Sequence, residues 1–195
     1  GDDSTALNDN LANTLEGTAG RDHLNGFGGA DTMSGGAGDD IYFVTSGDVI
    51  SDSGGIDTIF AEASFAIPSP IENITFTGSA NTASAGNWLP NAMTGNSGAN
   101  YLDGRGDNDT LAGAGGNDTL LGGAGADVFA FSEAGSAHAD SVNDFASGAD
   151  KIRLDASYFS AIGAEGDFAA GDARFVAGAG LSSGQDADDR VVYNT

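Results

Sequence analysis

The chain has no cysteine among its 195 residues, so neither a disulfide nor a thiolate metal site can stabilise its fold. Proline is also scarce, with 3 residues, and no apolar run approaches the roughly 18 residues of a membrane-spanning helix. Basic residues are few, because 6 Lys plus Arg face 29 Asp plus Glu and the formal charge is −23. We therefore expect neither nucleic acid nor an anionic membrane surface as a partner, and no membrane span.

What the chain does contain is glycine and aspartate. Glycine supplies 32 residues, and the acidic residues divide into 24 Asp and only 5 Glu. Short carboxylates suit turns and the binding of hard cations. A disordered acidic tail would share this charge, but 39% of the residues are hydrophobic and they recur at regular intervals. We expect a chain that is disordered without calcium and folded with it.

Two blocks of the chain repeat with a period of nine residues, each in one unbroken frame. In the first block, residues 17–25 read GTAGRDHLN, residues 26–34 read GFGGADTMS and residues 35–43 read GGAGDDIYF. The second block reads GNSGANYLD, GRGDNDTLA, GAGGNDTLL and GGAGADVFA from Gly95 onward. Weaker rows precede the blocks, with Asn13 and Leu15 before the first and Asn91 and Met93 before the second.

Two positions of the repeat carry its chemistry. The sixth position holds Asp22, Asp31, Asp40, Asn100, Asp109, Asp118 and Asp127. The eighth holds Leu24, Met33, Tyr42, Leu102, Leu111, Leu120 and Phe129. Glycines allow tight turns, and the residues around each hydrophobe predict a short strand whose central side chain points inward. The pattern predicts an all-β parallel solenoid in which two rows complete one coil.

Residues 18 apart then stack at the sheet spacing of about 4.8 Å. A calcium ion with oxygen ligands at about 2.3 to 2.6 Å fits between two stacked carboxylates. We predict these metal-binding pairs: Asp22 with Asp40, Asp109 with Asp127, Asn100 with Asp118, Asn13 with Asp31, and Asn91 with Asp109. Pairs that contain Asn should bind more weakly.

The rows resemble the nonapeptide Gly-Gly-x-Gly-x-Asp-x-hydrophobe-x of the RTX (repeats-in-toxin) family, a calcium-binding β-roll. Residues 144–152 are similar to the segment that follows the roll in secreted bacterial proteases and lipases. The resemblance implies that backbone carbonyls complete each site. They come from positions two and four of one turn and positions one and three of the turn one coil later. The implied residues are Thr18, Gly20, Gly35, Ala37, Gly26, Gly28, Arg105, Asp107, Gly122, Ala124, Asn96, Gly98, Gly113, Gly115, Gly104 and Gly106.

The chain divides by composition into a roll and a following region. Residues 1–131 are predicted to form the β-roll, with calcium blocks at about 13–44 and 86–131 and coils without standard calcium turns at about 45–85. Residues 132–195 are predicted to be a β-rich C-terminal cap, with apolar clusters such as Tyr158 and Phe159, Phe175 and Val176, and Val191 to Tyr193. Asp48 and Asp57 lie one residue off the frame, and we favour an ordinary solvent-facing pair over a slipped calcium turn.

One motif could suggest an enzyme. Residues 180–184 read GLSSG, similar to the nucleophile elbow of α/β-hydrolases around Ser182. That fold expects a histidine after the nucleophile, whereas His23 and His138 both precede it, and no HExxH zinc motif occurs. We predict no catalytic residue and no enzymatic activity.

The resemblance implies a bacterial module that is secreted, extracellular or displayed on the cell surface. It would fold on binding several calcium ions outside the cell, pass through the type I secretion machinery unfolded, and stabilise a neighbouring domain of a larger polypeptide. Because Gly1 follows no initiator Met, we expect a piece of a longer or processed protein. The alternatives are a polysaccharide-recognition or adhesin module and a surface-lattice module with calcium between chains. The scarcity of cations argues against an acidic polysaccharide.

Overall fold

The computed structural model describes residues 4–5, 10–132, 138–155, 157 and 166–168. Its regular elements are short β-strands, and these residues include no helix. The strands are β1 (Ser4–Thr5), β2 (Thr14–Glu16), β3 (His23–Asn25), β4 (Thr32–Ser34), β5 (Ile41–Val44), β6 (Val49–Ser51), β7 (Thr58–Ala61), β8 (Asn73–Phe76), β9 (Thr82–Ala85), β10 (Ala92–Thr94), β11 (Asn100–Asp103), β12 (Thr110–Ala112), β13 (Thr119–Leu121), β14 (Val128–Phe131), β15 (Ser141–Val142), β16 (Lys151–Leu154) and β17 (Gly166–Phe168). Within the described residues, no helix is available to cross a membrane.

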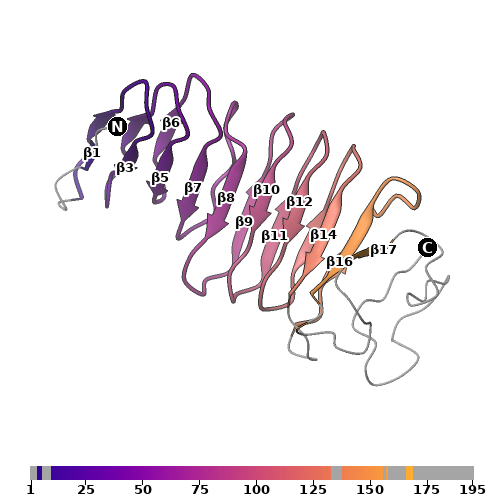
Figure 1. The fold of residues 1–195 in the computed structure, drawn as a ribbon. Coiled ribbons are helices and arrows are strands. Elements are labelled where there is room, and N and C mark those ends of the chain that lie inside the picture. The colour runs from indigo at the N-terminus through magenta and orange to yellow at the C-terminus, as the bar shows by residue number, and fades with distance from the viewer. Residues whose placement is uncertain (1–3, 6–9, 133–137, 156, 158–165, 169–195) are drawn as a thin grey trace.

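The strands stack along one axis into a parallel solenoid (Figure 1). A 10-stranded sheet runs the length of the array in the order β1-β3-β5-β7-β8-β10-β12-β14-β16-β17. The facing strands form a 3-stranded sheet, β2-β4-β6, and a 4-stranded sheet, β15-β13-β11-β9. Neighbouring strands pair in parallel throughout, except that β17 is antiparallel to β16. The predicted all-β parallel solenoid is confirmed.

The register of the strands shows that two nonapeptides form one coil. In the first block Leu24 pairs with Tyr42, and in the second block Leu102 pairs with Leu120. Each of these partners lies 18 residues further along the chain. Equivalent positions of alternate rows are therefore direct neighbours in the stack, as the period predicts.

The core is a file of side chains from the eighth position of each row. Strand burial alternates exposed and buried around a central hydrophobe, as in the exposed–buried–exposed pattern of β2. The fully buried residues of this file are Leu24, Met33, Tyr42, Leu102, Leu111, Leu120 and Phe129. Because each coil contacts only the next, stability depends on contacts between neighbouring coils.

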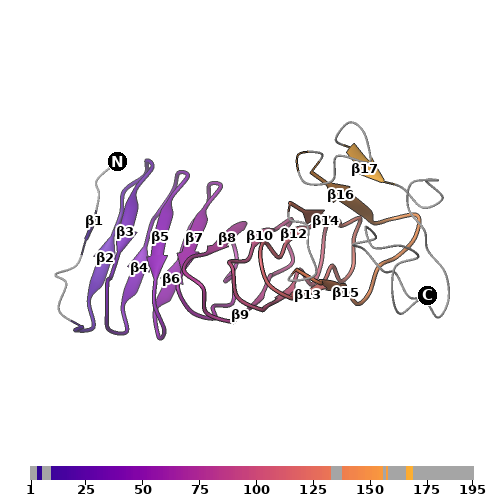
Figure 2. The same cartoon turned by 90° about the horizontal axis from the view of Figure 1, so that it is seen from below.

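The middle coils keep the same axis without the nonapeptide. From β5 to β7 the paired residues Tyr42 and Ile59 are 17 apart, and from β7 to β8 the pair Ile59 and Ile74 is only 15 apart. The facing sheet is interrupted here, between β6 and β9 (Figure 2). The predicted solvent-facing pair is wrong, because Asp57 is fully buried and Asp48 is 8% exposed. Because the coils that lead to them have 17 residues, Asp48 stacks on Asp31 and Asp57 stacks on Asp40.

Strand pairing continues beyond residue 131 into the region predicted as a cap. Strand β15 pairs with β13, and β16 pairs with β14 through Phe129 and Ile152. The residues 138–155 therefore add one further coil. The apolar clusters from Tyr158 to Tyr193, and Ser182 with its GLSSG motif, lie outside the described residues.

Candidate metal centres

Several turns between strands have a left-handed backbone at the second and fourth positions of the row. In the first block Gly36 and Gly38 are examples, with φ of 100° and 118°. In the second block Arg105 and Asp107 adopt φ of 72° each despite carrying side chains. Such non-glycine conformations cost on the order of 1 to 3 kcal/mol each and persist only where the surrounding structure holds them. Contacts with the neighbouring coils therefore hold these turns in their conformation.

A ladder of side chains connects each turn to the turn one coil earlier. The backbone N–H of Asp22 donates to Oδ1 of Asp40 at 2.8 Å, and that of Asp109 donates to Oδ1 of Asp127 at 2.8 Å. The same contact joins Asn100 to Asp118, Asn13 to Asp31 and Asn91 to Asp109, each at 2.7 Å. All five predicted pairs are thus brought together, although their role as ligands stays a prediction.

The second oxygen of several ladder carboxylates has no partner of its own. The residues concerned are Asp31, Asp40, Asp57, Asp109 and Asp127, whose Oδ2 atoms are buried and accept no hydrogen bond from any described residue. A buried carboxylate oxygen without a donor is costly unless a cation or a proton neutralises it. An oxygen-only donor set of carboxylates and carbonyls is what calcium takes. The residues present therefore fit a calcium ion.

The first glycine of the row leaves room for this oxygen. A Cβ built on Gly104 would lie 2.3 Å from Oδ2 of Asp109 and 2.8 Å from the carbonyl oxygen of Gly122. On Gly95, a Cβ would lie 2.2 Å from the Gly113 carbonyl oxygen and 2.3 Å from Oδ1 of Asn100. The sixth-position side chain and the first-position carbonyl of the next coil converge on the same space.

Carbonyls of the second and fourth positions point along the stack toward the next coil. The carbonyl oxygens of Thr18 and Arg105 lie 2.1 Å and 2.3 Å from a Cβ built on the glycine 18 residues later, and the Asp107 carbonyl lies 2.0 Å from one built on Gly125. Thr18 and Arg105 also accept the N–H groups of Ala37 and Ala124, at 3.3 Å and 2.9 Å. The Thr18, Arg105 and Asp107 carbonyls therefore lie between successive turns, and their role as ligands stays a prediction.

The other predicted carbonyl residues lie in the same turns. Gly26 is packed against the Asp31 carboxylate, Gly28 against the side chain of Asn10, and Gly106 against the ring of Trp88. The carbonyls of Gly20 and Gly98 face Gly38 and Gly116 of the next coil. Gly115 lies in the turn between β12 and β13.

The side-chain amides of asparagines at the sixth position form hydrogen bonds within the protein and need no cation as a partner. Oδ1 of Asn91 accepts the Asn87 N–H at 2.9 Å, and its amide nitrogen donates to the Ile71 and Glu72 carbonyls at 3.2 Å and 3.1 Å. Asn100 is satisfied in the same way by Asn96 and Thr82. These contacts occupy amide groups that would otherwise face a cation, and the weaker calcium binding of pairs with Asn stays a prediction.

Sequence reasoning missed four members of the ladder. The N–H groups of Asp31 and Asp40 donate to Oδ1 of Asp48 and Asp57, at 2.9 Å and 2.8 Å. At the other end, those of Asp118 and Asp127 donate to Asp140 and Asp150, at 2.9 Å and 3.0 Å. The spacings of 17, 22 and 23 residues hide these four from a fixed frame. The signal that remains is a hydrophobe two residues after each Asp, such as Ile50 after Asp48.

Burial dominates the electrostatics of the ladder. Desolvation, together with the charge of Asp127, raises the pKa of Asp109 to about 7 against the opposing hydrogen bond from Asn91. Desolvation likewise raises the pKa of Asp57 to about 7 and raises that of Asp40 and Asp127. Without a cation, burial therefore makes these carboxyls harder to ionise than an ordinary aspartate.

The raised pKa values mean that protons, as well as calcium, stabilise the fold relative to the unfolded chain. The metal-free fold is favoured below the unfolded-state value of 3.8 and loses stability as pH rises through about 7. The unfolded chain and a calcium-bound fold are both deprotonated near neutral pH, so the pH dependence falls on the metal-free fold. We expect more β structure to remain in chelator at about pH 5 than at about pH 8. Circular dichroism in chelator at both pH values checks this, and equal spectra would contradict it.

The glycine cradle gives a second test. We expect Gly104→Ala to raise the calcium midpoint, because the methyl group displaces the Asp109 carboxylate and costs about 1 to 3 kcal/mol of ligand interaction. Gly78→Ala is the matched control, since φ there is 75° but a Cβ meets nothing within 4 Å. A calcium titration followed by circular dichroism should separate the two variants. A larger effect in the control would show that backbone strain alone matters.

Comparison with known proteins agrees with this geometry. The model of the RTX calcium-binding nonapeptide repeat matches in four copies, at residues 8–42 and 94–129. These two segments contain all of the predicted Asp–Asp and Asn–Asp pairs except one member, Asn91. No curated protein and no solved structure matches the chain. These four copies supply the carboxylate ladders of both blocks, and residues 8–42 and 94–129 are therefore RTX calcium-binding nonapeptide repeats.

Proposed function

We propose that this RTX β-roll module couples calcium binding to folding outside the cell, and that it serves as a binding and folding device without catalytic activity. The observation that carries the proposal is the row of buried Oδ2 atoms, in which Asp109 and Asp127 of adjacent coils accept no hydrogen bond from the described residues. When these carboxylates are charged, they repel each other and destabilise the stacking of the two coils. A cation bound between them would replace this repulsion by attraction.

The size of the carboxylate repulsion and of the stabilisation by calcium favours a fold that forms only when calcium is bound. Two stacked carboxylates about 5 Å apart repel by roughly 0.8 to 3 kcal/mol, for an effective dielectric between water and a protein surface. Calcium at about ten times its dissociation constant stabilises the fold by roughly 1.4 kcal/mol per site. Several sites together reach about the 5 to 15 kcal/mol of a whole domain. Metal binding is then the main source of folding free energy.

A calcium-dependent fold supports a role in export. A chain that stays unfolded at low cytoplasmic calcium can be threaded through a type I secretion channel and can fold where calcium is abundant. The folded roll would then stabilise a neighbouring domain of the same polypeptide in the bacterial extracellular space or at the cell surface.

Limited proteolysis tests the proposal on the chain itself. In chelator, protease should digest residues within both blocks, whereas millimolar calcium should protect a fragment that spans β2 to β16. Magnesium at the same concentration is the control, because its shorter bonds and octahedral geometry suit these turns poorly. Equal protection in chelator and in calcium would refute the proposal.

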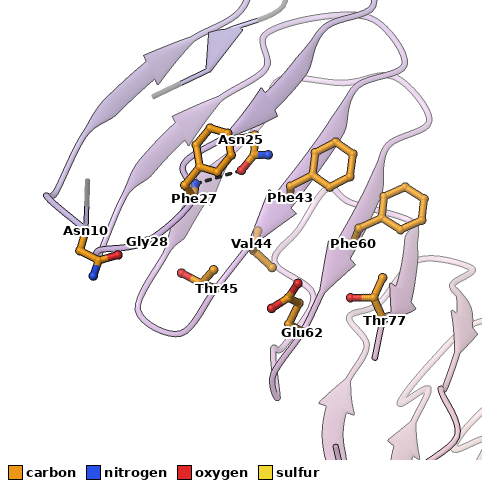
Figure 3. A pocket seen from close by; sticks show the side chains of 10 residues that line it. All are labelled: Asn10, Asn25, Phe27, Gly28, Phe43, Val44, Thr45, Phe60, Glu62 and Thr77. Carbon is orange, nitrogen blue, oxygen red and sulfur yellow. Dashed lines mark hydrogen bonds between the residues drawn. The ribbon is translucent and has the colours of Figure 1, made fainter. Parts of the chain in front are cut away.

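A second candidate function is the binding of a neutral glycan, and one surface feature favours it. Phe27, Phe43 and Phe60 lie side by side along a groove of about 620 Å³ on the outer face of the first coils (Figure 3). Phe43 and Phe60 stack with centroids 5.4 Å apart and planes 17° from parallel. Asn25 and Thr77 supply polar groups beside the rings. Aromatic faces with a few polar groups suit the apolar faces and hydroxyls of a sugar chain.

Charge selects the class of glycan. The described residues that line the groove include Glu62 but no Lys or Arg. With a formal charge of −23 on the chain, an acidic polysaccharide would be repelled. Calorimetric titration with neutral oligosaccharides is the test, and Phe43→Ala should remove binding while Tyr101→Ala, at an exposed aromatic residue of β11, should not. No heat with any neutral oligosaccharide would eliminate this candidate.

A further inference from the structure

We infer that Asp40, Asp52 and Asp57 form a further calcium site, distinct in composition from the nonapeptide sites. One ligand oxygen from each residue lies within 4.8 Å of the other two. The site lies at the end of the first block, because the matched repeats stop at residue 42 and Asp52 follows directly after β6, the last strand of the 3-stranded sheet. The inference rests on the proposed function only for the identity of the cation.

Two buried oxygens point to a ligand. Asp40 is 1% exposed and Asp57 is fully buried, and Oδ2 of each accepts no hydrogen bond from the described residues. Their Oδ1 atoms are already engaged, by the N–H groups of Asp22 and Asp40 at 2.8 Å each. The two free oxygens belong to neighbouring coils.

Asp52 supplies the third carboxylate from a turn position where the nonapeptide has glycine. It precedes Asp57 by five residues, as Gly35 precedes Asp40. The hydroxyl of Tyr42 accepts the Gly35 N–H at 2.9 Å and donates to Oδ2 of Asp52. Oδ1 of Asp52 accepts the Gly54 N–H at 2.7 Å. These two contacts fix the carboxylate against its neighbours while leaving lone pairs on both oxygens.

The donor set favours calcium. Three carboxylates supply only oxygen ligands, whereas zinc prefers nitrogen and sulfur, and magnesium demands near-ideal octahedral geometry. Oxygens within 4.8 Å of one another fit a calcium coordination sphere, in which ligands on opposite sides are about 4.6 to 5.2 Å apart. Three carboxylates also give a charge of about −3, which favours a trivalent lanthanide as a probe of the same site. The site would fasten the end of the 3-stranded sheet to the coils that lack calcium turns.

The test counts ions. Equilibrium dialysis with calcium should show one ion fewer bound to Asp52→Asn than to the parent chain. Asp57→Asn, which removes another corner of the cluster, should lose the same ion. Asp39→Asn is the matched control, because Asp39 is exposed, carries the same charge and accepts only the Ile56 N–H at 2.9 Å. Circular dichroism in saturating calcium should confirm that each variant is folded.

Terbium luminescence gives an independent readout. The Tyr42 hydroxyl contacts Asp52, so excitation of tyrosine should sensitise a bound terbium ion, and Asp52→Asn should lose most of that emission. Equal ion counts in the parent and Asp52→Asn, or an equal loss in Asp39→Asn, would overturn the site. If the parent is folded and binds no calcium, but one terbium ion is bound and lost in Asp52→Asn, the site stands and the calcium-folding function fails.

Discussion

Removal of calcium should abolish most of the β structure of this chain. The reason is the set of buried oxygens without donors, such as Oδ2 of Asp109 and Asp127, which carry charge in neighbouring coils. Without calcium each such pair repels by roughly 0.8 to 3 kcal/mol. The core of the calcium blocks offsets little of this, since strands such as β3, β12 and β13 each contribute one large inward side chain. We expect a disordered spectrum in chelator at neutral pH and a cooperative transition on adding calcium.

Far-UV circular dichroism during a calcium titration measures this effect. Magnesium at matched ionic strength controls for screening of the −23 charge, because screening by salt does not require a bound ion. Full β structure in chelator would mean that the solenoid folds without calcium and that calcium binding contributes little to its stability. The export proposal would then lose its physical basis.

The second large effect is expected at Asp109. This residue donates its N–H to Asp127 and accepts the N–H of Asn91, so its side chain lies between two successive coils of the second block. Asp109→Ala should therefore impair two adjacent sites and interrupt the propagation of the stack. At about 1.4 kcal/mol per site, the loss is roughly 3 kcal/mol, and because the remaining sites share it, the calcium midpoint should rise by about fivefold.

Asp22→Ala is the matched comparison within the first block. Oδ2 of Asp22 already accepts the Thr18 N–H at 2.6 Å and the Thr18 hydroxyl at 3.0 Å, so this carboxylate depends less on a cation. It also lies near one end of its row, where loss of a site should fray the array without dividing it. Calcium titrations of both variants should show the larger shift for Asp109→Ala. Equal midpoints for Asp109→Ala and the parent chain would refute the mechanism.

The sequence alone determined the repeating part of the molecule. A strict period of nine encodes two strands per coil, so the inward position of Leu24 and Leu111 and the pairing of Asp109 with Asp127 followed by counting. This works because in a stack of equal coils the separation along the chain fixes the neighbour in space. The family resemblance named the cation for the same residues.

Only the tertiary structure decided what happens where the coils change length. Asp57 stacks on Asp40 at a spacing of 17 residues and Asp150 on Asp127 at 23, and strand pairing, which the local sequence does not count, sets both. The structure also separated carboxylates that are satisfied within their own turn, such as Asp22, from those left without a donor, such as Asp109. That difference depends on the orientation of single N–H groups in the folded turn. The fold also brings Asp52 close to Asp40, although their separation of 12 residues matches no multiple of the repeat. After β6 the chain returns from the 3-stranded sheet to the 10-stranded sheet, and Asp52 lies on that connection.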